Sequence, residues 1–219
     1  IFCGLLLLAL ILYPISSTLS RLATLLTLAL LWAWSLYLGW IRPGIRYLLL
    51  GMPVTLILVF SLPGRTIDSN ELRQTYVTTL QWFEGTAYQW GGENEIGIDC
   101  SGLVRQGLIR ANFLLGLKTL NSRLLRESVS LWWHDASAQM LRDEYLGQTK
   151  RLFTARSLNQ VEYTQLLPGD FAVTTNGIHT LAYLGNHTWL EADPKVRKVI
   201  TVPVPAQNIV WFNMPVYLM

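Results

Sequence analysis

Acidic residues are missing from the first 63 positions of this 219-residue chain. That segment holds only three charged side chains, Arg21, Arg42 and Arg46, whereas the remaining 14 Lys and Arg balance all 14 Asp and Glu in the rest of the chain. The formal net charge of +3 therefore belongs to the apolar N-terminal third. Because no general basic surface remains elsewhere, the chain lacks the electrostatic footprint of a nucleic-acid-binding protein, and we expect no nucleic-acid partner.

Cysteine and histidine are also scarce. The chain has two cysteines, Cys3 in the first apolar run and Cys100 in the polar part, so the polar part cannot hold an internal disulfide. One thiol and three histidines at scattered positions make a poor ligand set for zinc. We therefore expect no metal and no other cofactor.

Three long apolar runs fill the N-terminal third, at residues 1–15, 22–40 and 47–62. A membrane-spanning helix needs about 20 apolar residues, so the second run fits, and the third fits with its flanking residues. The first run is shorter and would be the end of a span or the hydrophobic part of a signal sequence. We predict two or three transmembrane helices in residues 1–63 and a polar domain in residues 64–219, the alternative being a very apolar soluble helical bundle.

The loops between these runs predict an orientation. Arg42 and Arg46 lie in the connection between the second and third runs, and the first connection holds only Arg21. The positive-inside rule places Arg42 and Arg46 in the cytoplasm. The third run then crosses outward, and the polar domain emerges on the outer side of the lipid bilayer.

The polar domain reads as helices followed by strands. One helix is expected to begin after Asp68 as N-cap and to end at Gly85, and a second to begin at Cys100 with Asp99 as N-cap. The segment from 112 to 166 reads as further helices and loops, including a helix at 131–145. Apolar runs bounded by turn residues predict strands at 171–174, 179–184, 189–192 and 199–202. This order is typical of an α+β fold with an antiparallel sheet.

Cys100 is a candidate nucleophile because of its place at a helix start. The free N–H groups and the dipole at a helix N-terminus favour a thiolate, which is the form that attacks a carbonyl carbon. On its own, however, a lone cysteine is more often an inert small side chain in the core.

A nucleophilic cysteine needs a base, and His179 is the best candidate among the three histidines. His134 lies in a Trp-Trp-His-Asp segment and reads as a packed or surface residue, and His187 lies in a hairpin turn. His179 opens a predicted strand, where its ring can be held rigidly against a facing helix N-terminus.

A third polar group should orient the imidazole of His179 and fix its tautomer. Glu191 and Asp193 point to the same face of the return strand, because side chains alternate along a strand. Glu191 lies deeper in that strand and can sit beside His179 across the hairpin, whereas Asp193 precedes Pro194 and reads as lying past the strand end. An exposed strand carboxylate remains the alternative for Glu191.

Four ordered segments resemble the NlpC/P60 family of papain-like cysteine peptidases. They are Tyr-x-Trp-Gly-Gly at 88–92, Gly-Ile-Asp-Cys-Ser-Gly-Leu-Val at 97–104, Leu-Pro-Gly-Asp at 167–170, and His179 followed by Tyr-Leu-Gly at 183–185. The cysteine precedes the histidine, as in the unpermuted members. The resemblance covers roughly residues 70–200, and the four motifs together make it specific.

The resemblance implies an α+β, papain-like core in which the cysteine helix packs on an antiparallel sheet, here preceded by transmembrane helices. It implies Cys100 as nucleophile and His179 as general base. The family's third polar position falls on Glu191, where many members carry His, Asn or Gln, so a carboxylate departs from the family pattern.

The resemblance also implies substrate-binding residues. Tyr88 matches a tyrosine that lines the acyl-side pocket and helps to polarise the carbonyl oxygen, and the Cys100 N–H would donate to the oxyanion. Asp99 and Ser101 match residues that recognise a free substrate amine. Asp99 is also the expected helix cap, so one of its two roles must dominate.

The function implied is that of a membrane-anchored cysteine endopeptidase of the bacterial cell wall. The family mostly cleaves peptidoglycan stem peptides, often between the γ-carboxyl of D-glutamate and a diamino acid. The catalytic domain would then face the periplasmic or extracellular side of the inner (plasma) membrane. Two alternatives stay open: a papain-like amidase or acyltransferase on another amide, and a catalytically inactive membrane scaffold.

Overall fold

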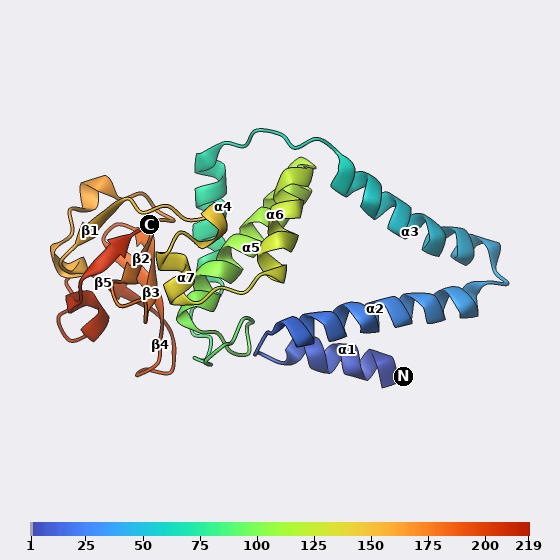
Figure 1. Cartoon of the computed structure of the whole chain (residues 1–219), viewed down its shortest axis with the longest axis horizontal. Helices are drawn as coiled ribbons and strands as arrows, with labels where there is room; N and C mark the ends of the chain where they lie inside the picture. Colours follow the sequence, from blue (N-terminus) through green and yellow to red (C-terminus); the bar gives the residue numbers. More distant parts are fainter. Residues whose placement is uncertain (1) are drawn as a thin grey trace.

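The computed structural model describes residues 2–219, in which helices precede strands (Figure 1). The α-helices are α1 (Phe2–Leu12), α2 (Thr18–Gly39), α3 (Pro43–Ser61), α4 (Ser69–Gln81), α5 (Cys100–Thr119), α6 (Ser122–Trp133) and α7 (Ala138–Arg142). The strands are β1 (Phe153–Ala155), β2 (Phe171–Thr174), β3 (Thr180–Gly185), β4 (Thr188–Asp193), β5 (Lys198–Pro203) and β6 (Val216–Leu218). Short 3-10 helices lie at Tyr145–Gly147, Leu158–Gln160, Tyr163–Gln165 and Val210–Asn213.

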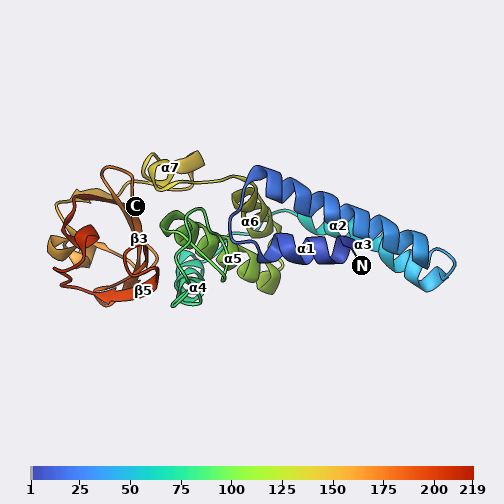
Figure 2. The ribbon, with the colours of Figure 1, turned by 90° about the horizontal axis from the view of Figure 1, so that it is seen from below.

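Helices α2 and α3 extend away from the rest of the molecule (Figures 1 and 2). With 22 and 19 residues they are long and apolar enough to cross a membrane by length and composition, whereas α1 is shorter, at 11 residues. Helices α2 and α3 carry large exposed apolar side chains, such as Leu30, Leu48 and Ile57. The turn between them lies at the far end of the molecule from the sheet, and α4 to α7 lie between the sheet and this hairpin (Figure 2).

The sheet has six antiparallel strands in the order β1-β6-β2-β3-β4-β5. The predicted α+β class with an antiparallel sheet is therefore confirmed. Strands β2 to β5 lie within about one residue of the predicted ranges. Strands β1 and β6 were not predicted, because three residues each are too few to show an alternating pattern.

Three details of the sequence-based prediction were wrong. The helix expected at 131–145 is interrupted, since α6 ends at Trp133 and α7 begins only after Ser137, whose hydroxyl caps the Met140 N–H at 3.2 Å. Helix α4 ends four residues before Gly85, which lies in the following turn with a φ of +83°. Asp193 is the last residue of β4, not beyond it, and pairs in register with Lys198.

Helix α5 packs across one face of the sheet, against β3 and β4. Leu80 and Leu103 from the helices meet Ala182 and Leu190 from the strands in one buried cluster. Because side chains alternate along a strand, the other face of the sheet carries a second cluster with Trp189 at its centre. This packing fixes the N-terminus of α5 at β3.

Candidate active site

Asp99 and Cys100 form the start of α5. Asp99 is the N-cap, and its Oδ1 accepts the Gly102 N–H at 2.6 Å and the Ser101 hydroxyl at 2.9 Å. Its Oδ2 accepts the Gly91 N–H at 2.8 Å, so both carboxylate oxygens are engaged. Cys100 is the first helical residue, as the sequence predicts, and its carbonyl accepts the Thr180 hydroxyl at 2.6 Å. This bond ties the cysteine to the first residue of β3.

His179 and Glu191 form a buried pair at the sheet. The Nε2 atom of His179 lies 2.7 Å from Oε2 of Glu191, and the two side chains are 3% and 0% exposed. The His179 N–H donates to the Thr174 hydroxyl oxygen at 3.0 Å, which fixes the backbone just before β3. Trp211 stacks on the imidazole with ring centroids 4.3 Å apart and an interplanar angle of 19°. The ring is therefore held by Glu191 at one nitrogen and by Trp211 on one face.

The Cys100 thiol lies beside the His179 ring, because its sulfur is 3.9 Å from the carbonyl oxygen of Ile178 and its own carbonyl is bound by Thr180, the two residues that flank His179. Since Nε2 is engaged by Glu191, Nδ1 is the ring nitrogen left to face the sulfur. Burial alone would lower the pKa of His179, but the hydrogen bonds and negative charges of Cys100 and Glu191 outweigh it and raise the pKa to about 9. The arrangement thus favours an imidazolium beside the sulfur.

Glu191 is the most deeply buried member of the set. Burial raises the pKa of Glu191, and the hydrogen bond with His179 and its charge partly offset that effect. Its Oε1 atom has no hydrogen-bond partner among the described residues. The carboxylate therefore has His179 as its main stabilising partner, which couples the ionisation of the two groups.

Tyr88 lies on the loop that precedes α5, where its N–H donates to the Arg197 carbonyl at 2.9 Å. Burial, together with the negative charges of Cys100, Asp99 and Asp193, raises the pKa of the Tyr88 hydroxyl to about 12. The hydroxyl therefore keeps its proton at neutral pH and can act as a hydrogen-bond donor near Cys100.

A cleft of about 460 Å³ opens at Cys100. Its walls come from the loop before α5, the segment leading into α7, and the turn before β3. The residues that line it include Trp90, Asp99, Ser101, Asp135, Ser137 and Ile178, and also Ser16 from the connection between α1 and α2. The sulfur of Cys100 lies 3.9 Å from the Ile178 carbonyl oxygen. The nucleophile candidate is thus at the floor of an open groove.

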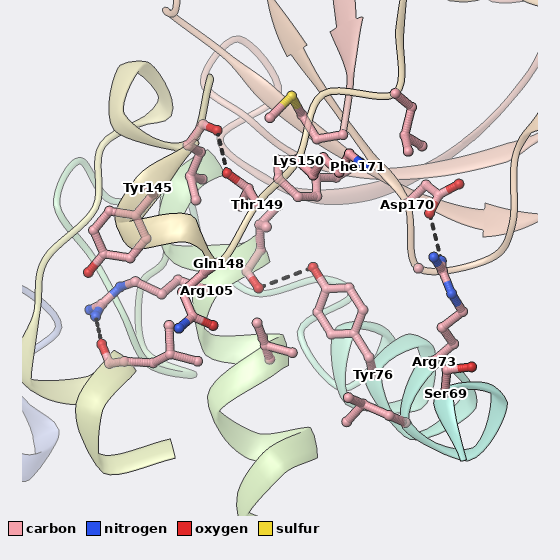
Figure 3. A pocket seen from close by; sticks show the side chains of 18 residues that line it. Ser69, Arg73, Tyr76, Arg105, Tyr145, Gln148, Thr149, Lys150, Asp170 and Phe171 are labelled. Atoms are coloured by element: carbon pink, nitrogen blue, oxygen red, sulfur yellow. Dashed lines mark hydrogen bonds and ion pairs between the residues drawn. The ribbon is translucent and has the colours of Figure 1, made fainter. Parts of the chain in front are cut away.

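A second cavity, of about 330 Å³, lies between α4, α5 and the segment after α7 (Figure 3). Leu72, Tyr76 and Leu108 give it an apolar lining, and the Arg73–Asp170 ion pair, at 2.6 Å, lies at its edge. Arg105 also lines this cavity and pairs with Glu93, which lines the cleft, so the Arg105–Glu93 ion pair connects the two hollows. The candidate catalytic residues lie elsewhere.

The fold brings together all the site residues predicted from the sequence. Cys100 lies against the residues that flank His179, and His179 is bound to Glu191. Asp99 and Ser101 line the cleft with Cys100, and Tyr88 lies near enough to Cys100 and Asp99 for their charges to raise its pKa. Within residues 2–219, no group of three or more His, Cys, Asp or Glu side chains is arranged to hold a metal ion.

Three neighbours of the site were missed by sequence reasoning. Trp211 lies more than 30 positions after His179 in an irregular segment, where neither spacing nor periodicity could single it out. Ser16 lies between two apolar runs and reads as part of a membrane connection. Asp135 was read only as the neighbour of His134.

A family model described as the NlpC/P60 family matches residues 85–210. No curated protein sequence matches the chain at a significant level. The matched range contains Cys100, His179 and Glu191.

Several solved structures are similar to this chain. An NlpC/P60 family protein from Bacillus cereus ATCC 10987 is 14% identical, with 73% of this chain and 41% of that chain covered and a TM-score of 0.43. NlpC2 from Trichomonas vaginalis is 14% identical, with 72% and 50% covered and a TM-score of 0.44. The peptidoglycan hydrolase RipB from Mycobacterium tuberculosis is 20% identical, with 93% and 89% covered and a TM-score of 0.42. The chain spans half or less of the first two of these structures.

Proposed function

Because the chain belongs to the NlpC/P60 family of cysteine peptidases, we propose that it is a membrane-anchored endopeptidase that hydrolyses amide bonds in peptidoglycan stem peptides. One observation carries the proposal: the thiol at the first residue of α5 lies against the residues that flank His179, whose ring forms a buried pair with Glu191. An open cleft gives an extended peptide access to that thiol.

The proposed chemistry is acyl transfer to sulfur. The Cys100 thiolate attacks the amide carbon, a C–S bond forms, and the His179 imidazolium gives its proton to the leaving amine as the C–N bond breaks. His179 then takes a proton from water, whose oxygen attacks the thioester; the C–S bond breaks, the acid is released, and the Cys100 thiolate and the His179 imidazolium are restored. Glu191 would hold the ring orientation and stabilise the imidazolium in both halves of the cycle.

Two donors are available for the oxyanion. The Cys100 N–H is at the first helical position, where a backbone N–H has no acceptor within the helix. The Tyr88 hydroxyl, with its pKa raised to about 12, is the second donor. Both would strengthen their hydrogen bonds as the carbonyl oxygen becomes negative, and this lowers the barrier.

The proposed scissile bond joins the γ-carboxyl of D-glutamate to a diamino acid. Asp99 and Ser101 are the residues proposed to recognise a free amine of the substrate. Since Asp99 already accepts from Gly102, Ser101 and Gly91, we assign its main role to capping α5, with Ser101 and the exposed Asp135 carboxylate facing the cleft. The Ser101 hydroxyl and the Asp135 carboxylate can both accept a hydrogen bond from an amine.

The proposed location is the bacterial inner membrane, with α2 and α3 as the spans and residues 64–219 as the catalytic domain on the periplasmic side. Arg42 and Arg46 lie at the turn far from the sheet and would be cytoplasmic (Figure 2). Holding the enzyme at the membrane would keep it near the wall.

The test uses the full chain in lipid nanodiscs with muropeptides of defined stem sequence. Mass spectrometry should detect products split at one stem-peptide bond, and Cys100→Ala should abolish turnover while the protein still unfolds in one cooperative transition. Intact muropeptides across all stem chemistries would remove the proposal. Cleavage of a different amide would then favour the amidase or acyltransferase alternative, and a Cys100 that iodoacetamide labels no faster than free cysteine would favour the inactive scaffold.

A further inference from the structure

The connection between α1 and α2, residues 13–17, lies against the loop that leads into the catalytic helix. We call it the α1–α2 loop. The Glu93 N–H donates to the Pro14 carbonyl at 2.9 Å, the Ser16 N–H donates to the Gly91 carbonyl at 3.4 Å, and Ile15 and Gly92 form an antiparallel bridge. These are strand-like contacts between segments more than 70 positions apart.

Asn94 extends this contact to the end of α1. Its side-chain amide donates to the carbonyls of Ile11 at 3.2 Å and Tyr13 at 3.1 Å, so it caps the helix terminus. The last turn of α1 and the α1–α2 loop are therefore both held by the loop before α5.

Arg21, in the first turn of α2, anchors the α1–α2 loop from the other side. It is 2% exposed although it belongs to an apolar helix. Its guanidinium lies 3.2 Å from Glu93 Oε2, donates to the Ser16 hydroxyl at 3.0 Å, and donates to the Trp133 carbonyl at 3.1 Å. A buried guanidinium is costly unless it is fully paired, so this cluster holds a defined geometry.

Glu93 is shared by two arginines, since Arg105 of α5 pairs with its other oxygen. Asp135 lies 3.8 Å from Arg21 and 4.0 Å from Arg105 and completes the charge balance of the cluster. Removing Arg21 would therefore leave Glu93 paired with Arg105, so the domain can keep its fold while the α1–α2 loop is released.

Ser16, Glu93 and Asp135 line the same cleft as Cys100. From this placement we infer that the α1–α2 loop is one wall of the substrate cleft and that Arg21 is the positioning residue that holds it there. The substrate peptide is bound between the catalytic domain and the base of the membrane hairpin, with Ser16 beside it. The identity of the substrate rests on the proposed function, whereas the wall rests on the contacts above.

Arg126 offers a matched control. It also links the domain to the hairpin, since its guanidinium donates to the Phe60 and Leu62 carbonyls at the end of α3, at 2.5 and 3.0 Å. It does not line the cleft. If these arginines served only as attachment, Arg21→Gln and Arg126→Gln would have the same effect.

The test uses the full chain in nanodiscs with Cys3→Ser, which leaves Cys100 as the remaining thiol of the two. Arg21→Gln should raise KM for a stem peptide about ten-fold and change kcat by less than about two-fold, because substrate positioning is lost while the reacting groups stay in place. Arg126→Gln should leave both unchanged. Ser16→Trp, which fills the groove, should lower kcat/KM at least about ten-fold. All variants should keep the wild-type rate of Cys100 alkylation by iodoacetamide.

Wild-type KM in both Arg21→Gln and Ser16→Trp would overturn the inference. If the wild-type chain cleaves no stem peptide, the proposed function fails instead. The position of the α1–α2 loop is then tested by comparing how fast a bulky and a small thiol reagent reach Cys100. A bulky dye-linked maleimide should then react with Cys100 faster, relative to iodoacetamide, in Arg21→Gln and slower in Ser16→Trp. Unchanged ratios would overturn the wall itself.

Discussion

The reactivity of this site depends on three side chains that stabilise one another's charges. His179 is buried, yet its pKa is raised to about 9, because Cys100 and Glu191 supply negative charge on both sides of the ring. Helix and strand starts in the sequence singled out Cys100 and His179 as candidates, and side-chain alternation in the return strand together with the family resemblance singled out Glu191. Trp211 could not be predicted, because it stacks on His179 only after the chain folds back from β5 to the site, and nothing in the neighbouring sequence indicates that path.

The raised pKa of His179 predicts a pH dependence of stability. A group whose pKa rises from an ordinary 6.5 to about 9 on folding adds stability that is fully present below pH 6.5 and is lost as the pH rises through 9. The unfolding midpoint should therefore fall over this interval, and should fall less in His179→Gln. Thermal unfolding of both proteins at several pH values checks this, and parallel curves would contradict it.

Trp211 is predicted to act by keeping water away from the His–Glu pair. Trp211→Ala should admit water, weaken the His179–Glu191 bond, and slow both turnover and alkylation of Cys100 by about ten-fold. Trp211→Phe keeps an aromatic ring on the imidazole and should retain most of both rates. If the alanine and phenylalanine variants have the same turnover and alkylation rates, the aromatic ring on His179 is not what sustains those rates.

At the scale of elements, the start of α5 decides where the sulfur lies. The cap at Asp99 and the apolar spacing that follows made this helix predictable, and turn residues made β2 to β5 predictable. The segment at 131–145 was misread because apolar residues recur on both sides of the break between Trp133, where α6 ends, and Ser137, whose cap begins a new helix. Local pattern alone does not separate these two cases.

Gly102 is predicted to be needed for the approach of the α5 terminus to its preceding loop. A Cβ at this position would meet the Gly92 carbonyl oxygen and lie 3.2 Å from Asp99 Oδ1. Gly102→Ala should therefore lower the free energy of unfolding by about 1–3 kcal/mol and displace Cys100, with loss of activity. Gly44→Ala, where a Cβ has open space, is the matched control. Equal stability of the two variants would show that the approach is not tight.

For the whole molecule, the apolar third and the polar domain could be predicted separately from charge and hydropathy, but their contact could not. Arg21 looked like a loop charge between two apolar runs, and its burial against Glu93 depends on a contact 72 positions apart in sequence. Long-range pairing of this kind leaves no periodic trace in the chain. The Arg21–Glu93 pair joins the proposed membrane anchor to the cleft.

The membrane orientation yields a direct prediction in cells. In a Cys3→Ser, Cys100→Ala background, a cysteine in place of the exposed Lys195 should react with a membrane-impermeant maleimide, whereas one in place of Arg46 should react only after the membrane is permeabilised. Labelling of Arg46→Cys in intact cells, with Lys195→Cys protected, would reverse the proposed orientation.

Trapping the acyl-enzyme tests the catalytic account most directly. The full chain is mixed with a defined stem peptide, quenched in acid within the first turnover, and digested for mass spectrometry. The account predicts a thioester adduct on the Cys100 peptide whose mass equals the acyl half of the substrate, with no adduct and no cleavage in Cys100→Ala. Cleavage that continues in Cys100→Ala, or turnover with the acyl group on another residue, would contradict it.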